Sequence, residues 1–421
     1  MRIVSDLHTH SRFAMACSQG ITVQGMDSTA AAKGINLLGT GDFTHPRWLA
    51  ELRASLEPAE AGLFRFRGSR SGVRFVLSAE ISSIFSGSGG AKRIHNCVLM
   101  PSFDAVDALN HVLSKRGNLE SDGRPQISMS AAELVEEVHR ADSGAFVFPA
   151  HVWTPYFGAL GAATGFDSLK EAYEDQEKRI LALETGLSSD PPMNWRISGL
   201  DKYALLSNSD MHSLPKMGRE MNVFEIDSGK LSYRAVMDAI KDRDASRFIR
   251  TIEFFPQEGK YHFDGHRQCL VSMDPDANSP ATCPVCGKGL VIGVMHRVKD
   301  LADREPGYVP PHAVPYTSMV PLREIIAYTM RKAETSVVVG KVYAGIVSRC
   351  GTEFDALLNA DTAEIGEASS IEIAQAVQNI RNGKVNIVPG YDGVFGKVDM
   401  LGRGSGAMPA SSAWRQKRLP G

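Results

Sequence analysis

Asp6-Leu7-His8-Thr9-His10 follows a short apolar run, Ile3-Val4, close to the start of the chain. The pattern predicts a strand, and because side chains alternate along a strand, both histidines project to the same side. Neutral imidazole is a common metal ligand, so two of them with a nearby carboxylate form half of a metal site. The stretch therefore predicts a metal centre if later segments deliver further ligands to the same place.

Later segments repeat this combination of an apolar run with a His, Asp or Glu. Five of the six clusters stand where a buried strand is predicted to stop, and His95 stands where one is predicted to begin. A single cluster is compatible with a hydrogen-bonded loop residue, whereas six at equivalent places indicate one shared site. The candidate ligands beyond the first pair are Asp42, His45, Glu80, His95, His151, Asp210 and His212.

Alternation of short apolar runs with helix-like segments, from residue 1 to about 227, predicts an α/β fold with a parallel sheet. About seven such units suggest a closed or distorted barrel, in which active-site groups gather at the carboxyl ends of the strands. Ser128 or Ser130, followed by Glu133, resembles a capping box at a helix start. The predicted helices span residues 26–33, 46–56, 103–113, 129–141 and 168–183.

Composition describes an ordinary globular protein, with 421 residues, a hydrophobic fraction of 43% and a charged fraction of 22%. This length predicts two or three domains. No signal peptide and no membrane-spanning apolar stretch is recognisable, so we expect a cytoplasmic protein with no membrane partner. A net charge of -2 means that any nucleic-acid binding depends on local patches.

Soft metal ligands form two pairs in the middle of the chain. Cys283-Pro284-Val285-Cys286 has the spacing of a zinc knuckle, and His266 and Cys269 are likewise separated by two residues. His266, Cys269, Cys283 and Cys286 complete a four-ligand set without a position for water, which predicts one structural zinc. His262 is the alternative first ligand.

A helix is predicted at 231–240, ahead of the soft ligands. The last quarter of the chain is predicted to be mainly helical, with helices at 322–332, 336–350 and 371–380. Lys241, Arg243, Arg247 and Arg250 form a basic cluster that is either a solvated helix end or a phosphate contact. A glycine-rich aromatic loop follows at 390–396, which is either a surface turn or a nucleotide contact. The tail from 402 is rich in Gly, Ser, Ala and Arg, and we expect it to be disordered.

The ordered set of candidate ligands resembles the polymerase and histidinol phosphatase (PHP) superfamily, whose distorted (β/α)7 barrels carry two or three metals. The resemblance implies one metal on His8, His10, Glu80 and Asp210, and a second on Glu80, His95 and His151. It implies a third position served by Asp42, His45 and His212, although Phe43 stands where the family often has a histidine. Zn, Mn, Fe or Mg would fill these positions, and the catalytic residues would be Asp210, His212, Glu80 and Asp42.

The order of parts resembles the endonuclease Q family as far as about Gly402, on residues 253–256, 259–266, the zinc module and 390–393. That resemblance implies a PHP barrel at 1–227, a linker helix and zinc module at 228–304, a helical DNA-binding domain at 305–401, and a tail at 402–421. It implies cleavage of DNA on the 5′ side of deaminated bases (uracil, hypoxanthine, xanthine) and abasic sites. A sliding clamp would be a partner in archaeal members, but the tail shows no clamp-binding motif.

Two other functions stay open from the sequence. A small-molecule phosphatase of the histidinol phosphate type shares the barrel but gives no role to the zinc module or the helical tail. A non-catalytic repair or helicase-accessory module is disfavoured by Glu80, Asp210 and His212, which retain the chemistry of a metal site. For the endonuclease, we expect Gly390, Tyr391, Gly393 and Phe395 to form the pocket that reads the base.

Overall fold

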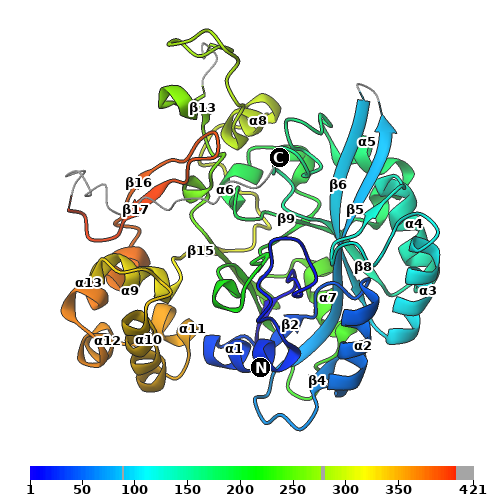
Figure 1. Ribbon diagram of the computed structural model, residues 1–421, viewed down its shortest axis with the longest axis horizontal. Helices are drawn as coiled ribbons and strands as arrows, with labels where there is room; N and C mark the ends of the chain where they lie inside the picture. Colours follow the sequence, from blue (N-terminus) through cyan, green and yellow to red (C-terminus); the bar gives the residue numbers. More distant parts are fainter. Residues whose placement is uncertain (88–89, 276–279, 404–421) are drawn as a thin grey trace.

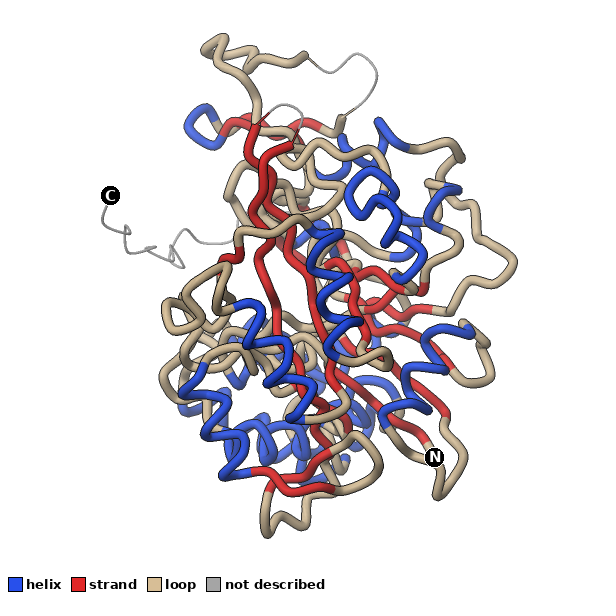
Figure 2. The backbone as a smooth tube through the Cα atoms, turned by 90° about the vertical axis from the view of Figure 1, so that its right-hand side faces the viewer, coloured by secondary structure: helices blue, strands red, loops and turns tan. Residues whose placement is uncertain are grey.

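The structure is a computed structural model that describes residues 1–87, 90–275 and 280–403. Strands gather in its centre with helices around them (Figure 2). The predicted α/β class is therefore confirmed. Residues 404–421, most of the tail for which disorder is expected, lie outside the described residues, as do two short internal segments.

The main sheet is mixed rather than parallel, which corrects the prediction. Its strand order is β15-β12-β11-β1-β2-β5-β4-β3, with β6 and β7 also paired to β5 and with β8 paired to β6. Neighbours β1 (Arg2–Asp6), β2 (Leu37–Gly39) and β5 (Arg74–Gly87) are parallel, but β11 (Met221–Glu225) pairs antiparallel with β1. A closed barrel stays a prediction. The remaining main-sheet strands are β3 (Leu56–Pro58), β4 (Phe64–Phe66), β7 (Gln126–Ile127), β8 (Phe146–Pro149), β12 (Phe248–Glu253) and β15 (Tyr316–Ser318).

A long antiparallel hairpin of β5 with β6 (Gly90–Met100) adds to the mixture, and it rises at the upper right of Figure 1. Glu80 pairs with Cys97, and Ser82 pairs with His95, in the middle of this hairpin. The predictions that Glu80 ends a strand and that His95 begins one are therefore wrong. Opposed residues of an antiparallel pair share a face, so Glu80, His95 and Cys97 all project toward the same side.

Helices cover the sheet much as predicted, and α2, α3 and α4 lie together at the right of Figure 1. Ser130, rather than Ser128, caps α4, because its side chain and that of Glu133 each accept a backbone N–H of the other. The helices are α1 (Val23–Lys33), α2 (Pro46–Ser55), α3 (Phe103–Leu113), α4 (Ala131–Ala141), α6 (Pro191–Asn194) and α7 (Tyr233–Asp242).

The predicted helix at 168–183 is wrong. Helix α5 (Leu169–Tyr173) stops at Glu174, whose φ of 52° is incompatible with a continuing helix, and a 3₁₀ turn follows over Glu174–Arg179. The buried run after it forms β9 (Ala182–Glu184), which pairs in parallel with β10 (Ala204–Leu206). Length and apolar content alone do not distinguish such a run from the end of a helix.

The C-terminal helices α9 (Leu322–Met330), α10 (Val337–Cys350), α11 (Glu353–Leu358), α12 (Thr362–Ala368) and α13 (Ile371–Arg381) pack together at the lower left of Figure 1. They share one hydrophobic cluster with the sheet, since Val4 of β1 and Ile325 of α9 both belong to it. The buried ion pair of Lys33 with Glu353, at 2.7 Å, joins α1 to α11. Sequence patterns missed α11 and α12, and the domain boundaries stay predictions.

The remaining segments extend from the other end of the molecule. Strands β13 (Asp264–His266) and β14 (Val271–Met273) precede α8 (Val294–Leu301) at the top of Figure 1. Strands β16 (Asn386–Val388) and β17 (Lys397–Asp399) hold the loop at 390–396 between them. Within the described ranges, every helix falls short of the length and apolar character needed to cross a membrane.

Candidate metal centre

The segment after β1 is held against a segment two hundred residues further along. The Asp210 N–H donates to the His8 carbonyl at 3.0 Å, and the His10 N–H donates to the Met211 carbonyl at 3.2 Å. Asp6 supports this join by accepting the Ser209 N–H at 3.0 Å. The backbone therefore places Asp210 beside both histidines.

Three of the predicted site residues have a strained backbone. Asp42, His151 and Asp210 have φ angles of 48°, 29° and 46°. Positive φ is uncommon outside glycine and costs free energy, so it persists where the surrounding structure imposes it, often at functional sites. Each of the three follows the end of a short strand, where the chain turns sharply into the site.

A first ligand group combines His8, His10, Glu80 and Asp210, whose potential ligand atoms all lie within 4.8 Å of one another. His10 Nε2 lies 3.1 Å from Glu80 Oε2 and 3.0 Å from Asp210 Oδ1. His8 Nε2 lies 3.5 Å from the same Glu80 oxygen. The structure therefore brings together the four residues that the sequence assigned to one metal.

A second ligand group lies on the other side of the same carboxylate. Glu80 Oε1 lies 2.7 Å from His95 Nδ1 and 2.9 Å from His151 Nε2. Each oxygen of Glu80 thus faces a different group, and the side chain is fully buried. This is the geometry that a carboxylate bridging two metal ions requires.

Most donor atoms of the two groups are arranged like ligands around a metal ion and not like hydrogen-bonded pairs. His8 Nε2, His10 Nε2, His95 Nδ1 and Asp210 Oδ1 are buried and make no hydrogen bond within the described residues. Ligands bound at about 2.1 Å in tetrahedral or octahedral geometry stand about 3.0–3.4 Å apart. The distances given above between donor atoms of the two groups run from 2.7 to 3.5 Å, an interval that includes this range. Both groups could therefore hold divalent metals.

Electrostatics favour the metal-binding protonation states of Glu80 and His95, whereas, despite burial, the surrounding carboxylates raise the pKa of His8, His10 and His151 above the ordinary value. Burial raises the pKa of Glu80, but His95, Arg124 and His8 lower it more, so its pKa lies well below the ordinary value. Burial lowers the pKa of His95 to about 4 despite the opposing charge of Glu80. A charged carboxylate and a neutral imidazole are the forms that ligate metal.

Two further carboxylates hold the first pair of histidines by their other ring nitrogens. His8 Nδ1 lies 3.0 Å from Glu184 Oε2, and His10 Nδ1 lies 2.9 Å from Asp42 Oδ1. Such carboxylates fix the ring and raise its basicity as a ligand. Glu184 was missed because 168–183 was predicted as a helix, although Leu181-Ala182-Leu183-Glu184 repeats the pattern of an apolar run ending in an acid.

Glu184→Gln is expected to weaken metal binding at the first group by about 10- to 100-fold. Glu184 also accepts the His151 N–H at 2.7 Å, so the amide would disturb both groups while keeping the side-chain volume. Metal titration of the stripped protein, followed by calorimetry, measures the effect. Exposed Glu171→Gln is the matched control, and equal affinities for the two variants would contradict the assignment.

The three residues predicted for a third metal are not gathered in the same way. Within the described part of the chain, none of the groups of three or more potential ligands includes Asp42, His45 or His212. Asp42 is occupied by His10 and by the Ser11 N–H, which lies 2.6 Å from Oδ2. The His45 ring stacks on Phe13 at 4.3 Å. A third metal position stays a prediction.

Arg124 enters the site and was not found from the sequence, where it is one arginine in a polar loop. Its Nη1 donates to Glu80 Oε2 at 3.0 Å, and its side chain is 22% exposed. The preceding Gly123 lies so close to Asp42 that an added Cβ would stand 2.4 Å from Oδ2. The loop is therefore packed tightly against the site and presents a guanidinium to it.

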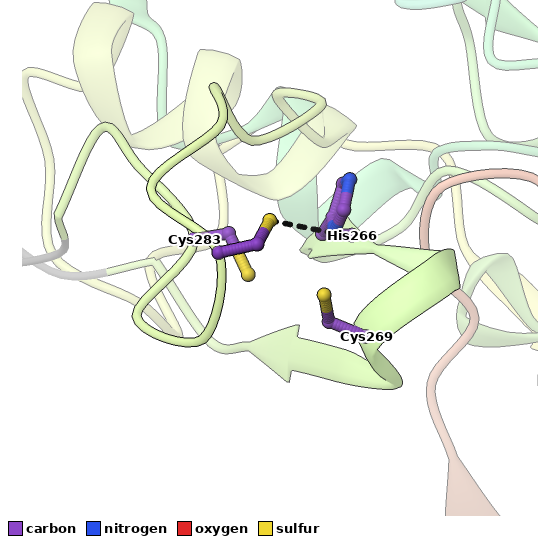
Figure 3. A group of neighbouring side chains, drawn as sticks. His266, Cys269 and Cys283 are labelled. Carbon is purple, nitrogen blue, oxygen red and sulfur yellow. Dashed lines mark hydrogen bonds between the residues drawn. The ribbon is translucent and has the colours of Figure 1, made fainter.

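The predicted zinc ligands form a third group, drawn in Figure 3. His266, Cys269, Cys283 and Cys286 all present ligand atoms within 4.8 Å of one another. Cys286 Sγ lies 3.7 Å from His266 Nδ1, close to the value of about 3.6 Å for tetrahedral zinc. The alternative His262 lies outside this group, and its buried ring is tilted against that of Phe263. The four residues could hold one structural metal ion.

The loop predicted to read the base packs on the segment before the zinc ligands. The Phe263 N–H donates to the Gly390 carbonyl, and the Tyr391 ring lies so close to Gly265 that a Cβ there would stand 2.4 Å from it. Phe395 is 63% exposed. Of the two aromatic rings, Phe395 is therefore the one available to a ligand. The predicted basic cluster is largely engaged, as Arg247 pairs with Asp242 at 2.8 Å.

Comparison with known proteins covers almost the whole chain. The family described as "MJ0043 C-terminal domain" matches residues 321–384. The uncharacterized protein YqxK of Bacillus subtilis is 27% identical over 372 residues, which cover 87% of this chain and 89% of that protein.

Two solved structures superpose with a TM-score of 0.83 each. One is the lesion-specific endonuclease PfuEndoQ from Pyrococcus furiosus, 30% identical, with 94% of this chain and 95% of that chain covered. The other is an endonuclease Q in complex with a 27-mer duplex substrate carrying an abasic lesion at the active site, 31% identical, with coverage of 94% and 96%. The chain therefore belongs to the endonuclease Q family.

Proposed function

We propose that this protein is a metal-dependent DNA endonuclease that hydrolyses the phosphodiester on the 5′ side of deaminated bases and abasic sites. The observation that carries the proposal is the fully buried Glu80, each of whose oxygens faces a different ligand group. The likeness to an endonuclease Q bound to an abasic-lesion duplex supports DNA as the substrate.

We infer the role of each residue from the ligand group to which it belongs. His8, His10, Glu80 and Asp210 would hold one divalent ion, and Glu80, His95 and His151 a second. Bound together, such ions neutralise an anionic phosphodiester and lower the pKa of the attacking water. The donor set suits Mn, Zn or Fe better than Mg²⁺, which prefers oxygen ligands. The zinc at 266–286 would be structural, because its four protein ligands leave no position for substrate.

Two polar side chains complete the proposed reaction site. Arg124 points its guanidinium at the Glu80 oxygen of the first group, where it can pair with a phosphate oxygen. His212 Nδ1 donates to the Asp210 carbonyl at 2.9 Å, which makes Nε2 the proton acceptor of the neutral ring. That nitrogen could take a proton from the attacking water and pass it to the leaving oxygen. Asp42 acts through His10, whose ring it holds.

Reading of the lesion requires the duplex to open, because a buried metal cluster cannot reach a phosphodiester beside a stacked base. Extrusion of a nucleotide costs a few kcal/mol, and less where deamination has already weakened pairing. Uracil and hypoxanthine share a carbonyl beside a ring N–H where the parent bases carry an amino group. The Gly390 and Gly393 N–H groups donate to the Gln257 and Lys260 carbonyls. The loop at 390–396 would therefore read the base through its remaining backbone groups, with Phe395 against the ring.

The function is tested with labelled duplexes that carry a single abasic site, deoxyuridine or deoxyinosine, beside an unmodified duplex. We expect nicking on the 5′ side of each lesion, with a 3′-hydroxyl and a 5′-phosphate, and no nicking of the unmodified duplex. Histidinol phosphate and nitrophenyl phosphate are assayed in parallel. Hydrolysis of these esters by metal-loaded protein that leaves every lesion intact would favour the small-molecule phosphatase.

Phe395→Ala is expected to lower cleavage at deoxyuridine and deoxyinosine by about tenfold, because base stacking on one ring contributes about 1–3 kcal/mol. Tyr391→Ala should instead lower the melting temperature, since that ring covers Gly265. Initial cleavage rates and thermal melts separate the two effects. An unchanged rate for Phe395→Ala would exclude this ring as the reader of the base.

A further inference from the structure

A line of aromatic side chains leads away from the second ligand group. The Phe157 ring stacks on His95, with centroids 4.5 Å apart and planes at 15°. The His95 N–H also donates to the Phe157 carbonyl at 3.0 Å. The next ring in the line is that of Tyr156, the residue before Phe157 in the sequence. Its centroid lies 6.4 Å from that of Phe157, and Tyr156 is 51% exposed. The line thus starts on a candidate metal ligand and emerges at the surface.

The line continues onto the segment that precedes the zinc ligands. Tyr156 and Tyr261 meet edge to face at 6.3 Å and 80°. Lys260 Nζ lies 5.5 Å from the centre of the Tyr261 ring and 5.9 Å from that of Phe395. We call Tyr156, Tyr261, Lys260 and Phe395 the aromatic ridge. It connects the second ligand group with the loop at 390–396.

The backbone beneath the ridge is fixed before any ligand binds. At Gly158, an added Cβ would stand 2.4 Å from the Val152 carbonyl oxygen, and at Gly161 it would stand 2.2 Å from that of Thr154. The Thr154 N–H donates to the His151 carbonyl at 2.8 Å. On the other side, the Gly393 N–H donates to the Lys260 carbonyl at 2.8 Å. Such a surface loses little conformational entropy when it binds.

The chemistry of the ridge matches unpaired nucleic acid. Aromatic faces stack with any base, and a neighbouring ammonium group attracts the phosphate backbone. A purely apolar partner would leave the Lys260 charge buried between two rings without compensation, which is costly. Opening of the duplex at the two ligand groups would produce unstacked bases near His95. The ridge begins at Tyr156, which Phe157 connects to His95.

We propose that the aromatic ridge is a stacking surface for the DNA bases that become unstacked next to the lesion, with Tyr156 taking the base beside the scissile phosphodiester. This inference rests on the proposed endonuclease function. It assigns a DNA contact to Tyr156 and Tyr261, outside the loop expected to read the lesion. The surface should matter most for paired substrates, in which bases must leave a stacked duplex.

The test compares Tyr156→Ala, Tyr156→Phe and Tyr308→Ala with the wild-type protein. Tyr308 is the matched control, an exposed tyrosine that lies under the Arg304 guanidinium at 4.2 Å. Tyr156→Ala should raise KM for an abasic-site duplex by about tenfold and have a smaller effect on the same lesion in a single strand. Tyr156→Phe and Tyr308→Ala should resemble the wild type. Metal content and thermal melts check that the variants are intact.

A second readout is independent of cleavage. A 2-aminopurine beside the lesion fluoresces when it is unstacked and is quenched when it stacks on a ring. In an Asp210→Asn background, quenching should be lost with Tyr156→Ala but retained with Tyr308→Ala. Unchanged KM and unchanged quenching for Tyr156→Ala would overturn the proposal that DNA bases stack on the ridge. Quenching that depends on Tyr156, in a wild-type protein that nicks no lesion, would instead retain the ridge and contradict the proposed function.

Discussion

Glu80→Gln is expected to lower lesion cleavage at least about 10³-fold, or roughly 4 kcal/mol of transition-state stabilisation. Glu80 is fully buried, and its two oxygens face different ligand groups. An amide has one oxygen and brings N–H donors to the other side, so it cannot bridge two cations. It also leaves Arg124 without the charge that it now contacts at 3.0 Å. Among the described residues, Glu80 is the carboxylate that belongs to both ligand groups, whereas Glu184 supports His8 and His151 from outside them.

Elemental analysis and a cleavage time course measure this prediction together. The variant should bind less metal at the two ligand groups around Glu80 than the wild type and keep the metal that we expect at His266, Cys269, Cys283 and Cys286. Glu136→Gln, on the exposed face of α4, is the control and should change neither quantity. Asp210→Asn provides a second variant if Glu80→Gln does not fold, and it should lose activity while DNA binding largely survives. Near-normal nicking by metal-loaded Glu80→Gln would refute the bridging role.

Cys283→Ser is expected to release about one zinc per chain and to lower the melting temperature by on the order of 5 °C. Cys283 is 1% exposed, and its backbone closes the knuckle, with its N–H donating to the Lys288 carbonyl at 2.6 Å and its carbonyl accepting from Gly287 at 2.8 Å. A hydroxyl is a poor zinc ligand, so the two halves of the module would no longer be joined.

Limited proteolysis locates the loss, because cleavage should become faster between residues 262 and 290. Cys350→Ser makes the same substitution on α10, away from the ligand groups, and should leave zinc content unchanged. The Cys283→Ser variant should keep the metal bound at the two ligand groups around Glu80. Unaltered zinc content and stability in Cys283→Ser would show that these four residues are not a zinc site.

The sequence by itself determined the residues of the centre better than their structural setting. His8, His10, Asp210 and His151 follow short apolar runs, and strand periodicity with ligand chemistry was enough to find them. The spacing of two residues between soft ligands, which suits one tetrahedral ion, was enough to predict that His266, Cys269, Cys283 and Cys286 come together. Helix caps were also local, as Ser130 with Glu133 illustrates.

The tertiary structure decided what depends on contacts between distant segments. Glu80 and His95 share a site because β5 and β6 continue as a long hairpin. No local pattern shows where such a strand ends, because apolar and small polar residues are both compatible with a strand. Glu184 and Arg124 reach His8 and Glu80 through space, from segments that look like a helix end and an ordinary loop. The aromatic ridge joins three segments far apart in the chain. Only packing brings such residues together, because side-chain chemistry is local to the sequence whereas proximity is set by the whole fold.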